Sequence, residues 1–456
     1  MKKIVLFLIV VSLIIPCQKE IASAKAFPTA RETVDDIGVG WNLGNSLDCN
    51  GEWIEKYTAN KPEDYEKAWG NPLTTKKMID AVKAAGFDVI RIPVTWERHM
   101  DETGKVDPAW MARVKEIVDY VIKDDLYCII NVHHDAGAEG WLRASKENYD
   151  KNSKKFAYLW KQIAEQFISY DEHLLFESVN EIIDESANWS STSPLGYEAV
   201  NDYNQLFVDT VRATKGNNAQ RNLVVMGYAA SGSKTNLNAF VIPKDTAEDH
   251  LMVEVHNYAP MDFTFVADWN EATRSSIWKE SFCQQLSYEI DILQEFQQKW
   301  KLPIIIGEFG ASNQDNASER AKYAGDMVKL TAKYGIKTFL WDDGGNMGTF
   351  NRRRAAFDYP EIVEAMMKES VKGEESVKKP ISVKKGKTVR VEFELEGTSK
   401  PKVSSNNKKI ARIVGTSVKN GRAVVIVKGV KKGNAKITLK VGAEKKTVRI
   451  TVTNTK

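Results

Sequence analysis

Leu174-Leu175-Phe176-Glu177-Ser178-Val179-Asn180-Glu181-Ile182 is an apolar run of strand length that ends in an amide and a carboxylate. A second run, Leu302-Pro303-Ile304-Ile305-Ile306-Gly307-Glu308, also ends in a glutamate. In a parallel barrel the buried strands read as continuous apolar runs, and their carboxyl ends carry the residues that do chemistry. Either segment alone is a weak signal, since Asn and Glu also fill ordinary loops. The pair of glutamates must therefore be judged against the rest of the chain.

Apolar runs of strand length alternate with amphipathic helical runs from about residue 37 to residue 370. The expected strands are Val39–Leu43, Phe87–Val94, Tyr127–Val132, Leu174–Val179, Asn222–Gly227, Leu251–Val255, Pro303–Gly307 and Lys337–Trp341. Eight strands alternating with helices predict an α/β fold whose parallel sheet closes as a (β/α)8 TIM barrel. A doubly wound open sheet is the alternative. It requires a glycine-rich phosphate loop, and Gly38–Gly44 has the wrong spacing and a bulky Trp in its middle.

Cap residues mark where several helices are expected to begin. Asp107 followed by Pro108 predicts a helix over residues 109–123, because an aspartate N-cap and a proline at the first helical position both favour a helix start. Three more helices are expected after serines: residues 154–169 after Ser153, 282–300 after Ser281, and 320–333 after Ser318.

The amino terminus has the features of an export signal. Lys2-Lys3 precede an apolar run from Ile4 to Ile15, and small residues follow in an Ala-x-Ala-like pattern at residues 22–26. This pattern predicts a signal peptide over residues 1–26, and the apolar run is too short to span a bilayer. We therefore expect a secreted, extracellular protein without a membrane span, with association at the cell surface as a further option.

Beyond the signal, three widely spaced cysteines remain: Cys49, Cys128 and Cys283. An odd number at this spacing does not make a disulfide framework. Cys128 lies within an expected strand and is interpreted as a small buried apolar residue.

The charge distribution divides the chain. Residues 371–456 contain 23 Lys and Arg but only 6 Asp and Glu, a net charge of +17, whereas residues 1–370 have a net charge of −14. Such asymmetry indicates two units with different surfaces. We expect a barrel domain over residues 27–368, a polar linker over residues 369–379 and a small all-β sandwich over residues 380–456. The expected strands of the sandwich are Thr388–Leu395, Ala423–Val427, Ala435–Val441 and Lys446–Val452.

The second domain offers little for stacking against sugars. Phe393 is its only aromatic residue, so an aromatic platform for carbohydrate is not expected there. Val403–Asn406, Ile410–Ile413 and Gly429–Ile437 resemble bacterial Ig-like modules of group 2. Two interpretations stay open: a solvated spacer, and a module whose positive charge attracts an anionic cell-wall polymer or acidic polysaccharide.

Polar residues gather at the ends of six expected strands in the first domain: Arg91, His133-His134-Asp135, Asn180-Glu181, His256-Asn257-Tyr258, Glu308 and Trp341-Asp342-Asp343. Hydrolysis of a glycosidic bond needs one carboxyl group that donates a proton and another that attacks or activates water. Strands four and seven of a closed barrel face each other across its mouth. Glu181 and Glu308 are therefore expected about 5–5.5 Å apart, the separation of a retaining glycosidase.

A metal site is not expected. His133 and His134 are adjacent and would diverge if both were in a strand. The sequence has neither an H-E-x-x-H nor a C-x-x-C pattern. We therefore expect no catalytic metal, no cofactor and no nucleic-acid partner.

The residues at the strand ends, taken with their neighbours, resemble the family 5 glycoside hydrolases, the (β/α)8 cellulases of clan A. The resemblance covers about residues 33–368 and rests on Arg91 in Ile90–Trp96, His133 in Asn131–His134, Asn180-Glu181, His256-x-Tyr258, Glu308 in Ile306–Gly310, and Trp341. Gly40–Asn45 and Trp69–Pro72 are similar to the bacterial endoglucanase and xyloglucanase subfamily.

The resemblance implies a role for each matching residue. Glu181 would be the acid/base and Glu308 the nucleophile, with Asn180 bound to the sugar 2-hydroxyl. The supporting residues would be Arg91 and Tyr258, which keep Glu308 ionised, His133 and His256, which orient the site, Trp341 beneath the −1 sugar, and His134 and Asn45, which contact substrate.

The expected function is that of a secreted retaining endo-β-1,4-glucanase acting on β-glucan. The same mechanism on xyloglucan, mannan, xylan or mixed-linkage β-glucan stays open. A non-catalytic polysaccharide-binding protein of the cell wall is the alternative from another class, but both acids are present. Six tryptophans are candidates for the glucan subsites, and some of them are expected in the core instead: Trp53, Trp69, Trp96, Trp141, Trp189 and Trp269.

Two positions depart from the family pattern. Ile182 follows Asn-Glu where proline is usual, and Asp343 stands where asparagine is common. Neither change removes a catalytic group. We expect them to affect fine specificity rather than mechanism.

Overall fold

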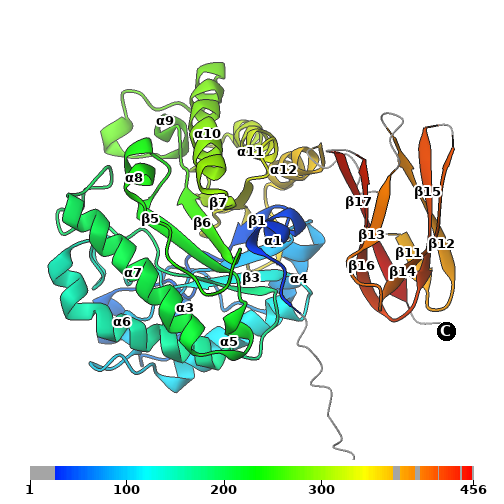
Figure 1. The fold of residues 1–456 in the computed structure, drawn as a ribbon. Helices are drawn as coiled ribbons and strands as arrows, with labels where there is room; N and C mark the ends of the chain where they lie inside the picture. Colours follow the sequence, from blue (N-terminus) through cyan, green and yellow to red (C-terminus); the bar gives the residue numbers. More distant parts are fainter. Residues whose placement is uncertain (1–25, 373–380, 396–400, 420, 442–443, 454–456) are drawn as a thin grey trace, which may run out of the picture.

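The computed structural model describes residues 26–372, 381–395, 401–419, 421–441 and 444–453. The expected signal peptide, except for residue 26, and residues 373–379 of the expected linker lie outside this range. The first domain is a closed barrel of eight strands in chain order (Figure 1). Its strands are β1 (Gly40–Asn42), β2 (Val89–Ile92), β3 (Tyr127–Asn131), β4 (Leu174–Glu177), β5 (Leu223–Ser231), β6 (Leu251–His256), β7 (Ile304–Phe309) and β8 (Lys337–Leu340). Every neighbouring pair is parallel, which confirms the predicted (β/α)8 barrel.

Helices form the outer layer around the barrel (Figure 1). They are α1 (Ala30–Asp36), α2 (Glu52–Tyr57), α3 (Pro62–Glu66), α4 (Lys76–Ala84), α5 (Pro108–Ile122), α6 (Lys146–Gln166), α7 (Pro194–Ala213), α8 (Lys234–Ala239), α9 (Met261–Thr264), α10 (Glu280–Trp300), α11 (Ala317–Ala332) and α12 (Pro360–Lys372). Short 3-10 helices lie at η1 (Glu97–His99), η2 (Gly216–Ala219) and η3 (Asp268–Asn270), and β9 (Phe350–Asn351) pairs with β10 (Ala356–Phe357). Across the described ranges, no helix combines the length and apolar character needed to cross a membrane.

The caps of the helices correct part of the prediction. Asp107 caps α5 as expected, with Pro108 at its first position. Ser153, however, lies inside α6, because the helix begins two turns earlier where Ser145 accepts a hydrogen bond from the Asn148 N–H. The first two turns of α6 are mostly polar, so the apolar periodicity used to find the helix does not reach them. The other two starts were also wrong: α10 begins at Glu280 after Lys279, and α11 begins at Ala317 after Asn316.

The half of the barrel interior at the amino-terminal ends of the strands is apolar. Helix α1 closes this end, where Val34 packs in one cluster with side chains such as Val89, Met252 and Phe339. Gly40 in β1 leaves the space that the Phe339 ring occupies, because a Cβ at residue 40 would lie 2.2 Å from that ring. This packed floor holds the strands in register beneath the polar layer above it.

Two residues closer to the carboxyl ends of these strands, the inward-facing residues of five strands are polar. They are Asn42, Arg91, Asn131, Glu177 and Glu254, all of them fully buried. Side chains two apart on a strand point to the same side, so each polar residue sits directly above an apolar one. The barrel therefore carries a layer of charges at its carboxyl-terminal end.

The C-terminal module has two sheets around one core of its own (Figure 1). Its strands are β11 (Ile381–Lys384), β12 (Thr388–Glu394), β13 (Lys402–Ser405), β14 (Ala411–Lys419), β15 (Arg422–Gly429), β16 (Gly433–Val441) and β17 (Glu444–Thr453). One sheet has the order β11-β17-β16-β13 and the other β12-β15-β14. The four strands expected from sequence are present and the all-β sandwich is confirmed. The prediction missed β11 and β13, which are short and polar, and β14, which is interrupted by a bulge between Ile413 and Gly415.

Candidate active site

Arg91 lies at the centre of the polar layer. Its guanidinium donates two hydrogen bonds to Glu177, at 2.6 and 2.7 Å, and one to Glu308 Oε1 at 2.6 Å. It also donates to the side-chain oxygens of Asn42 at 3.0 Å and Asn180 at 2.9 Å. All five N–H groups of the guanidinium are thus used. Arg91 thereby fixes Asn180 and Glu308, which come from different strands, relative to one another.

Glu177 and Glu254 belong to this network, although they were missed among the predicted site residues. Glu177 accepts from Arg91 and, at 2.8 Å, from the Asn131 amide. Glu254 Oε1 lies 3.3 Å from Arg91 Nε and 3.2 Å from His256 Nε2. The signal was present in the sequence, because a charged residue inside a continuous buried strand needs a partner.

Glu308 lies on β7 and points into the layer. It accepts from Arg91 through Oε1 and from the Tyr258 hydroxyl through Oε2 at 2.8 Å. Gly307, its neighbour, makes room for Glu254, since a Cβ at residue 307 would lie 1.6 Å from Glu254 Oε1. These contacts hold both oxygens of the Glu308 carboxylate in place.

Glu181 reaches the same space from the other side of the barrel. It lies four residues past the end of β4, with a left-handed backbone φ of 38°. Ligand atoms of Glu181, His256 and Glu308 all lie within 4.8 Å of one another. The two carboxylates are therefore too close for the 6.5–9.5 Å separation of an inverting glycosidase and suit the shorter separation of a retaining one.

His256 connects the two glutamates. Its Nδ1 lies 2.7 Å from Glu181 Oε1 and 3.6 Å from Glu308 Oε2, and its Nε2 faces Glu254. Burial alone would lower its pKa, but the charges of Glu308 and Glu181 and the hydrogen bonds to Glu181 and Glu254 raise the pKa to about 10. Both ring nitrogens face carboxylates, so both donate and neither offers a lone pair to a metal ion.

The two glutamates differ in electrostatic environment. Burial raises the pKa of Glu181, but the His256 cation outweighs it and holds that pKa below its usual value. Burial also raises the pKa of Glu308, and Glu181 adds to the rise against the opposing charges of His256 and Arg91. At neutral pH, the proton of the Glu181–His256 pair therefore lies on the imidazole.

His133, His134 and Trp341 line one side of this space. His133 is buried, and its ring stacks parallel to Trp341 at 6.0 Å. Burial, with His134 next, holds the pKa of His133 well below its usual value, so His133 is neutral. His134 is more exposed and lies 5.5 Å from the Trp69 ring. The two histidines were expected to diverge, but their rings lie 4.5 Å apart because both residues follow the end of β3 and do not alternate.

Asn45 stands somewhat apart from the other predicted site residues. It follows β1, and its backbone N–H donates to Asp48 while its carbonyl oxygen accepts from Asn71. Ile182 is fully buried, and its carbonyl oxygen accepts from the Ala229 N–H in β5. The residue that replaces the usual proline thus ties the loop of Glu181 to the neighbouring strand.

The six tryptophans considered for substrate subsites separate by exposure. Trp53, Trp69, Trp189 and Trp269 are exposed, between 37% and 65%. Trp96 is fully buried and donates to the Asn131 carbonyl oxygen, so it is one of the candidates that lie in the core. Trp141 is partly buried.

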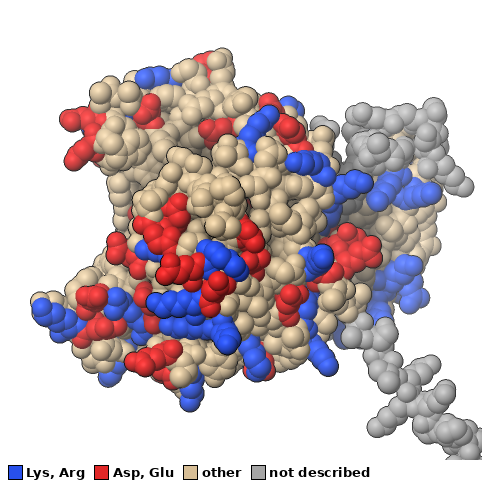
Figure 2. Space-filling view, turned by 60° about the vertical axis from the view of Figure 1, so that its left-hand side comes forward, with Lys and Arg blue, Asp and Glu red and all other residues tan. Residues whose placement is uncertain are grey.

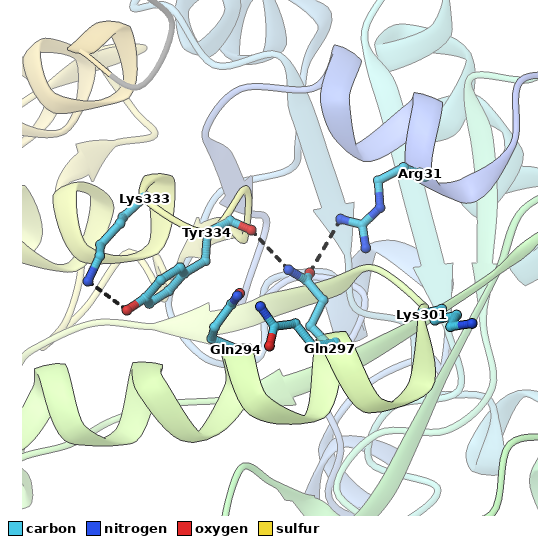
Figure 3. Close-up of a pocket in the computed structure, with 7 residues that line it drawn as sticks. Arg31, Gln294, Gln297, Lys301, Lys333 and Tyr334 are labelled. Atoms are coloured by element: carbon cyan, nitrogen blue, oxygen red, sulfur yellow. Dashed lines mark hydrogen bonds between the residues drawn. The ribbon is translucent and has the colours of Figure 1, made fainter. Parts of the chain in front are cut away.

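A separate depression of about 430 Å³ lies at the opposite end of the barrel (Figure 3). It is lined by Arg31, Gln294, Gln297, Gln298, Lys301, Lys333 and Tyr334. Gln297 bridges its walls, accepting from Arg31 and donating to the Tyr334 carbonyl oxygen. No carboxylate lines this depression, so it lacks the groups that hydrolysis of a glycoside requires.

Comparison with known proteins gives concordant results. The family model for cellulase, glycosyl hydrolase family 5, matches residues 47–347. Endoglucanase A of Clostridium longisporum is 38% identical over 356 residues, which span 76% of this chain and 66% of that protein. A broad specificity endoglucanase from Ruminococcus champanellensis, solved with bound cellotriose, is 39% identical with a TM-score of 0.70, over 75% of this chain and 98% of that one. A family 5 glycoside hydrolase from Prevotella bryantii, solved with a xyloglucan tetradecasaccharide, is 39% identical with a TM-score of 0.69. The match covers 75% of this chain and 99% of that one.

Proposed function

The chain belongs to the cellulase family, glycosyl hydrolase family 5, and from this membership we propose that it is a secreted, retaining endo-β-1,4-glucanase. The observation that carries the proposal is the approach of Glu181 and Glu308 to within 4.8 Å around His256. That separation leaves room for an anomeric carbon between the carboxylates but not for an additional water on the far face of the sugar.

In the first step, Glu308 attacks the anomeric carbon and the glycosidic C–O bond breaks. Arg91 and Tyr258 each donate to one oxygen of Glu308, which keeps the attacking carboxylate ionised and oriented. The His256 imidazolium passes its proton to Glu181 through their 2.7 Å hydrogen bond, and Glu181 passes it to the leaving oxygen, so that after this step Glu181 is a carboxylate and His256 is neutral. The product of this step is a glycosyl ester of Glu308.

In the second step, water attacks the same carbon and the ester bond breaks. Glu181 accepts the proton of the water and returns it to His256, and Glu308 is released as a carboxylate. Two displacements at one carbon retain its configuration. The Asn180 amide oxygen is held by Arg91, which leaves its NH2 group free to turn toward the sugar 2-hydroxyl. The stacked pair of His133 and Trp341 supplies a flat surface for the −1 sugar.

The preferred substrate is proposed as unbranched β-1,4-glucan, with xyloglucan as the second candidate. The exposed Trp53, Trp69, Trp189 and Trp269 supply flat apolar faces on which sugar rings stack. The xyloglucan-bound relative from Prevotella bryantii supports the second candidate. Mannan, xylan and mixed-linkage β-glucan use the same mechanism and differ in how well the subsites fit.

A panel of polysaccharides tests this proposal. Carboxymethyl cellulose, barley β-glucan, xyloglucan, mannan and xylan are assayed with wild type and with Glu308→Gln as the inactive control. We expect the highest turnover on a β-1,4-glucan or xyloglucan and none with the variant. Turnover confined to mannan or xylan would overturn the substrate assignment. Absence of hydrolysis on all five polysaccharides and on an activated aryl cellobioside would favour the polysaccharide-binding protein instead.

A further inference from the structure

The two outer faces of the C-terminal module are both basic, but they differ in how far acidic residues compensate the charge. Lys384, Lys402 and Lys440 are exposed on the sheet β11-β17-β16-β13. Lys402 pairs with Lys440 across β13 and β16, and Lys440 pairs with Lys445 across β16 and β17. A row of basic positions therefore crosses three neighbouring strands, about 4.8 Å apart.

A second basic row lies on the same sheet. Lys436 pairs with Arg449, four residues from Lys440 along β16. Between the two rows runs a row of hydroxyl-bearing positions, in which Thr438 pairs with Ser404 on one side and Thr447 on the other. The register thus alternates basic positions with hydroxyl-bearing positions at intervals of about 7 Å along the strands.

Acidic residues do not balance this face. The four strands of the sheet contain one acidic residue, Glu444, which pairs with Val441 at the end of the ladder, in register with the core-facing positions. The outer face of the other sheet also has exposed basic residues, namely Arg412, Arg422 and Lys428, but there an acidic residue compensates part of the charge, because Arg390 forms a 2.8 Å salt bridge with Glu392. In Figure 2, blue and red side chains are interspersed over the catalytic domain, whereas blue dominates the visible described part of the module.

Like charges directly opposite each other on neighbouring strands destabilise a sheet. The opposed pair Lys402 and Lys440 consequently has a cost in the free protein, and a polyanion bound along this face would remove that cost. A base-stacking surface is missing, because Phe393 is the only aromatic residue after residue 380 and is 4% exposed. Nucleic acid bound as a single strand is therefore disfavoured.

We propose that the outer face of the β11-β17-β16-β13 sheet binds an acidic polysaccharide, with uronate carboxylates on the basic rows and sugar hydroxyls on the row of serine and threonine. An acidic polysaccharide is a specific form of the anionic polymer expected as a partner of this module. Its binding does not depend on glycoside hydrolysis in the barrel domain. Lysine suits the task, because a mobile point charge binds closely spaced carboxylates without fixed geometry. Binding would hold the enzyme at walls where acidic polysaccharide accompanies β-glucan.

The test uses the full chain with two matched double variants. Lys402→Gln with Lys440→Gln removes an exposed basic pair from the proposed face. Arg412→Gln with Lys428→Gln removes an exposed basic pair, also in register, from the opposite sheet. Affinity for soluble polygalacturonate is measured at low and at physiological salt, with poly(glycerol phosphate) and single-stranded DNA as competing polyanions.

We expect the first variant to weaken polygalacturonate binding about tenfold at low salt and to flatten its salt dependence, because two exposed charge contacts are lost. The second variant should change affinity less than twofold. Equal losses in both variants, no binding by wild type, or tighter binding of either competing polyanion would overturn the proposal. Hydrolysis of a soluble aryl cellobioside should be unchanged in both variants, so failure here is distinguishable from failure of the enzymatic function.

Discussion

At the scale of single residues, Arg91 controls the geometry of the site. It is fully buried, and its planar guanidinium binds carboxylate or amide oxygens from three strands, β1, β4 and β7, or the loops that follow them. A lysine could not replace it, since an ammonium has three donors and no fixed fork. Around this cation, Glu177 and Glu254 compensate charge, while Glu308 also faces Glu181 and His256.

Glu254 acts through His256, and its amide variant tests that role. In Glu254→Gln the imidazolium loses one of the carboxylates that stabilise it, so the pKa of His256 should fall below about 10. We expect kcat to fall about tenfold with little change in KM, and the alkaline limb of the pH profile to move to lower pH. Glu254→Asp should recover part of the loss. An unchanged alkaline limb would show that Glu254 has only a structural role.

The pH dependence of Glu308 can be tested through its neighbour. Glu308 attacks as a carboxylate, so activity is lost as pH falls through its pKa, which burial and the charge of Glu181 raise. Glu181→Gln removes that charge and should lower the pKa. On an activated aryl glycoside, which needs little acid catalysis, the acid limb should therefore move to lower pH. A shift to higher pH would contradict the coupling, and Glu172→Gln, at a partly buried position just before the amino-terminal end of β4, serves as the control.

At the scale of elements, the strands could be predicted better than the helix starts. Buried strands such as β4 and β7 read as unbroken apolar runs, so all eight were placed from the sequence. Helix starts depend on which side chain meets a free N–H group, and several serines are equally suited locally. Whether Ser145 or Ser153 caps α6 depends on the geometry of the preceding loop. Neither the hydrophobic pattern nor the helix propensities of the sequence contain that information.

The cap of α6 can be tested directly. Ser145→Ala removes the acceptor of the Asn148 N–H and should lower the free energy of unfolding by about 1 kcal/mol. Ser153→Ala, in the interior of the same helix, should be neutral or slightly stabilising, because alanine is the better helix former. Thermal unfolding of both variants provides the measurement. A larger loss from Ser153→Ala would contradict the observed helix start.

The part of the site that lies at strand ends could be predicted, because the strands themselves could be placed from the sequence. Glu181, Glu308, His256 and Tyr258 follow or end strands, so the barrel topology brings them to one end. Glu177 and Glu254 were missed because they lie within strands that were treated as apolar. The sequence left open which of the six tryptophans lie in the core, because a tryptophan near a strand end, such as Trp96, can turn toward either the core or the cleft, and only packing decides which.

At the scale of the whole molecule, the chain contains two separate hydrophobic cores. The barrel has apolar layers inside and outside its strands, and the module has a core formed by both of its sheets. The charge asymmetry between residues 1–370 and 371–456 predicted two units. It could not indicate which sheet face carries the basic rows, because that depends on strand register.

Separate cores predict separate unfolding transitions. Ile437 is fully buried in the module, and Ile437→Ala should destabilise that unit by about 2–5 kcal/mol. In calorimetry, the module transition should shift to lower temperature by more than about 8 °C while the barrel transition stays in place. Hydrolysis of a soluble substrate should not change. A common shift of all transitions would contradict the independence of the two units.

The central claim is that Glu308 attacks the sugar while Glu181 handles the proton. It is tested most directly by incubation with an activated 2-deoxy-2-fluoro-β-cellobioside, which slows breakdown of the glycosyl ester, followed by peptide mass spectrometry. We predict one equivalent of sugar esterified to the peptide containing Glu308, and no label in Glu308→Gln. A label on another residue, or hydrolysis of the unfluorinated glycoside without any trapped ester and with inversion at the anomeric carbon, would contradict the account.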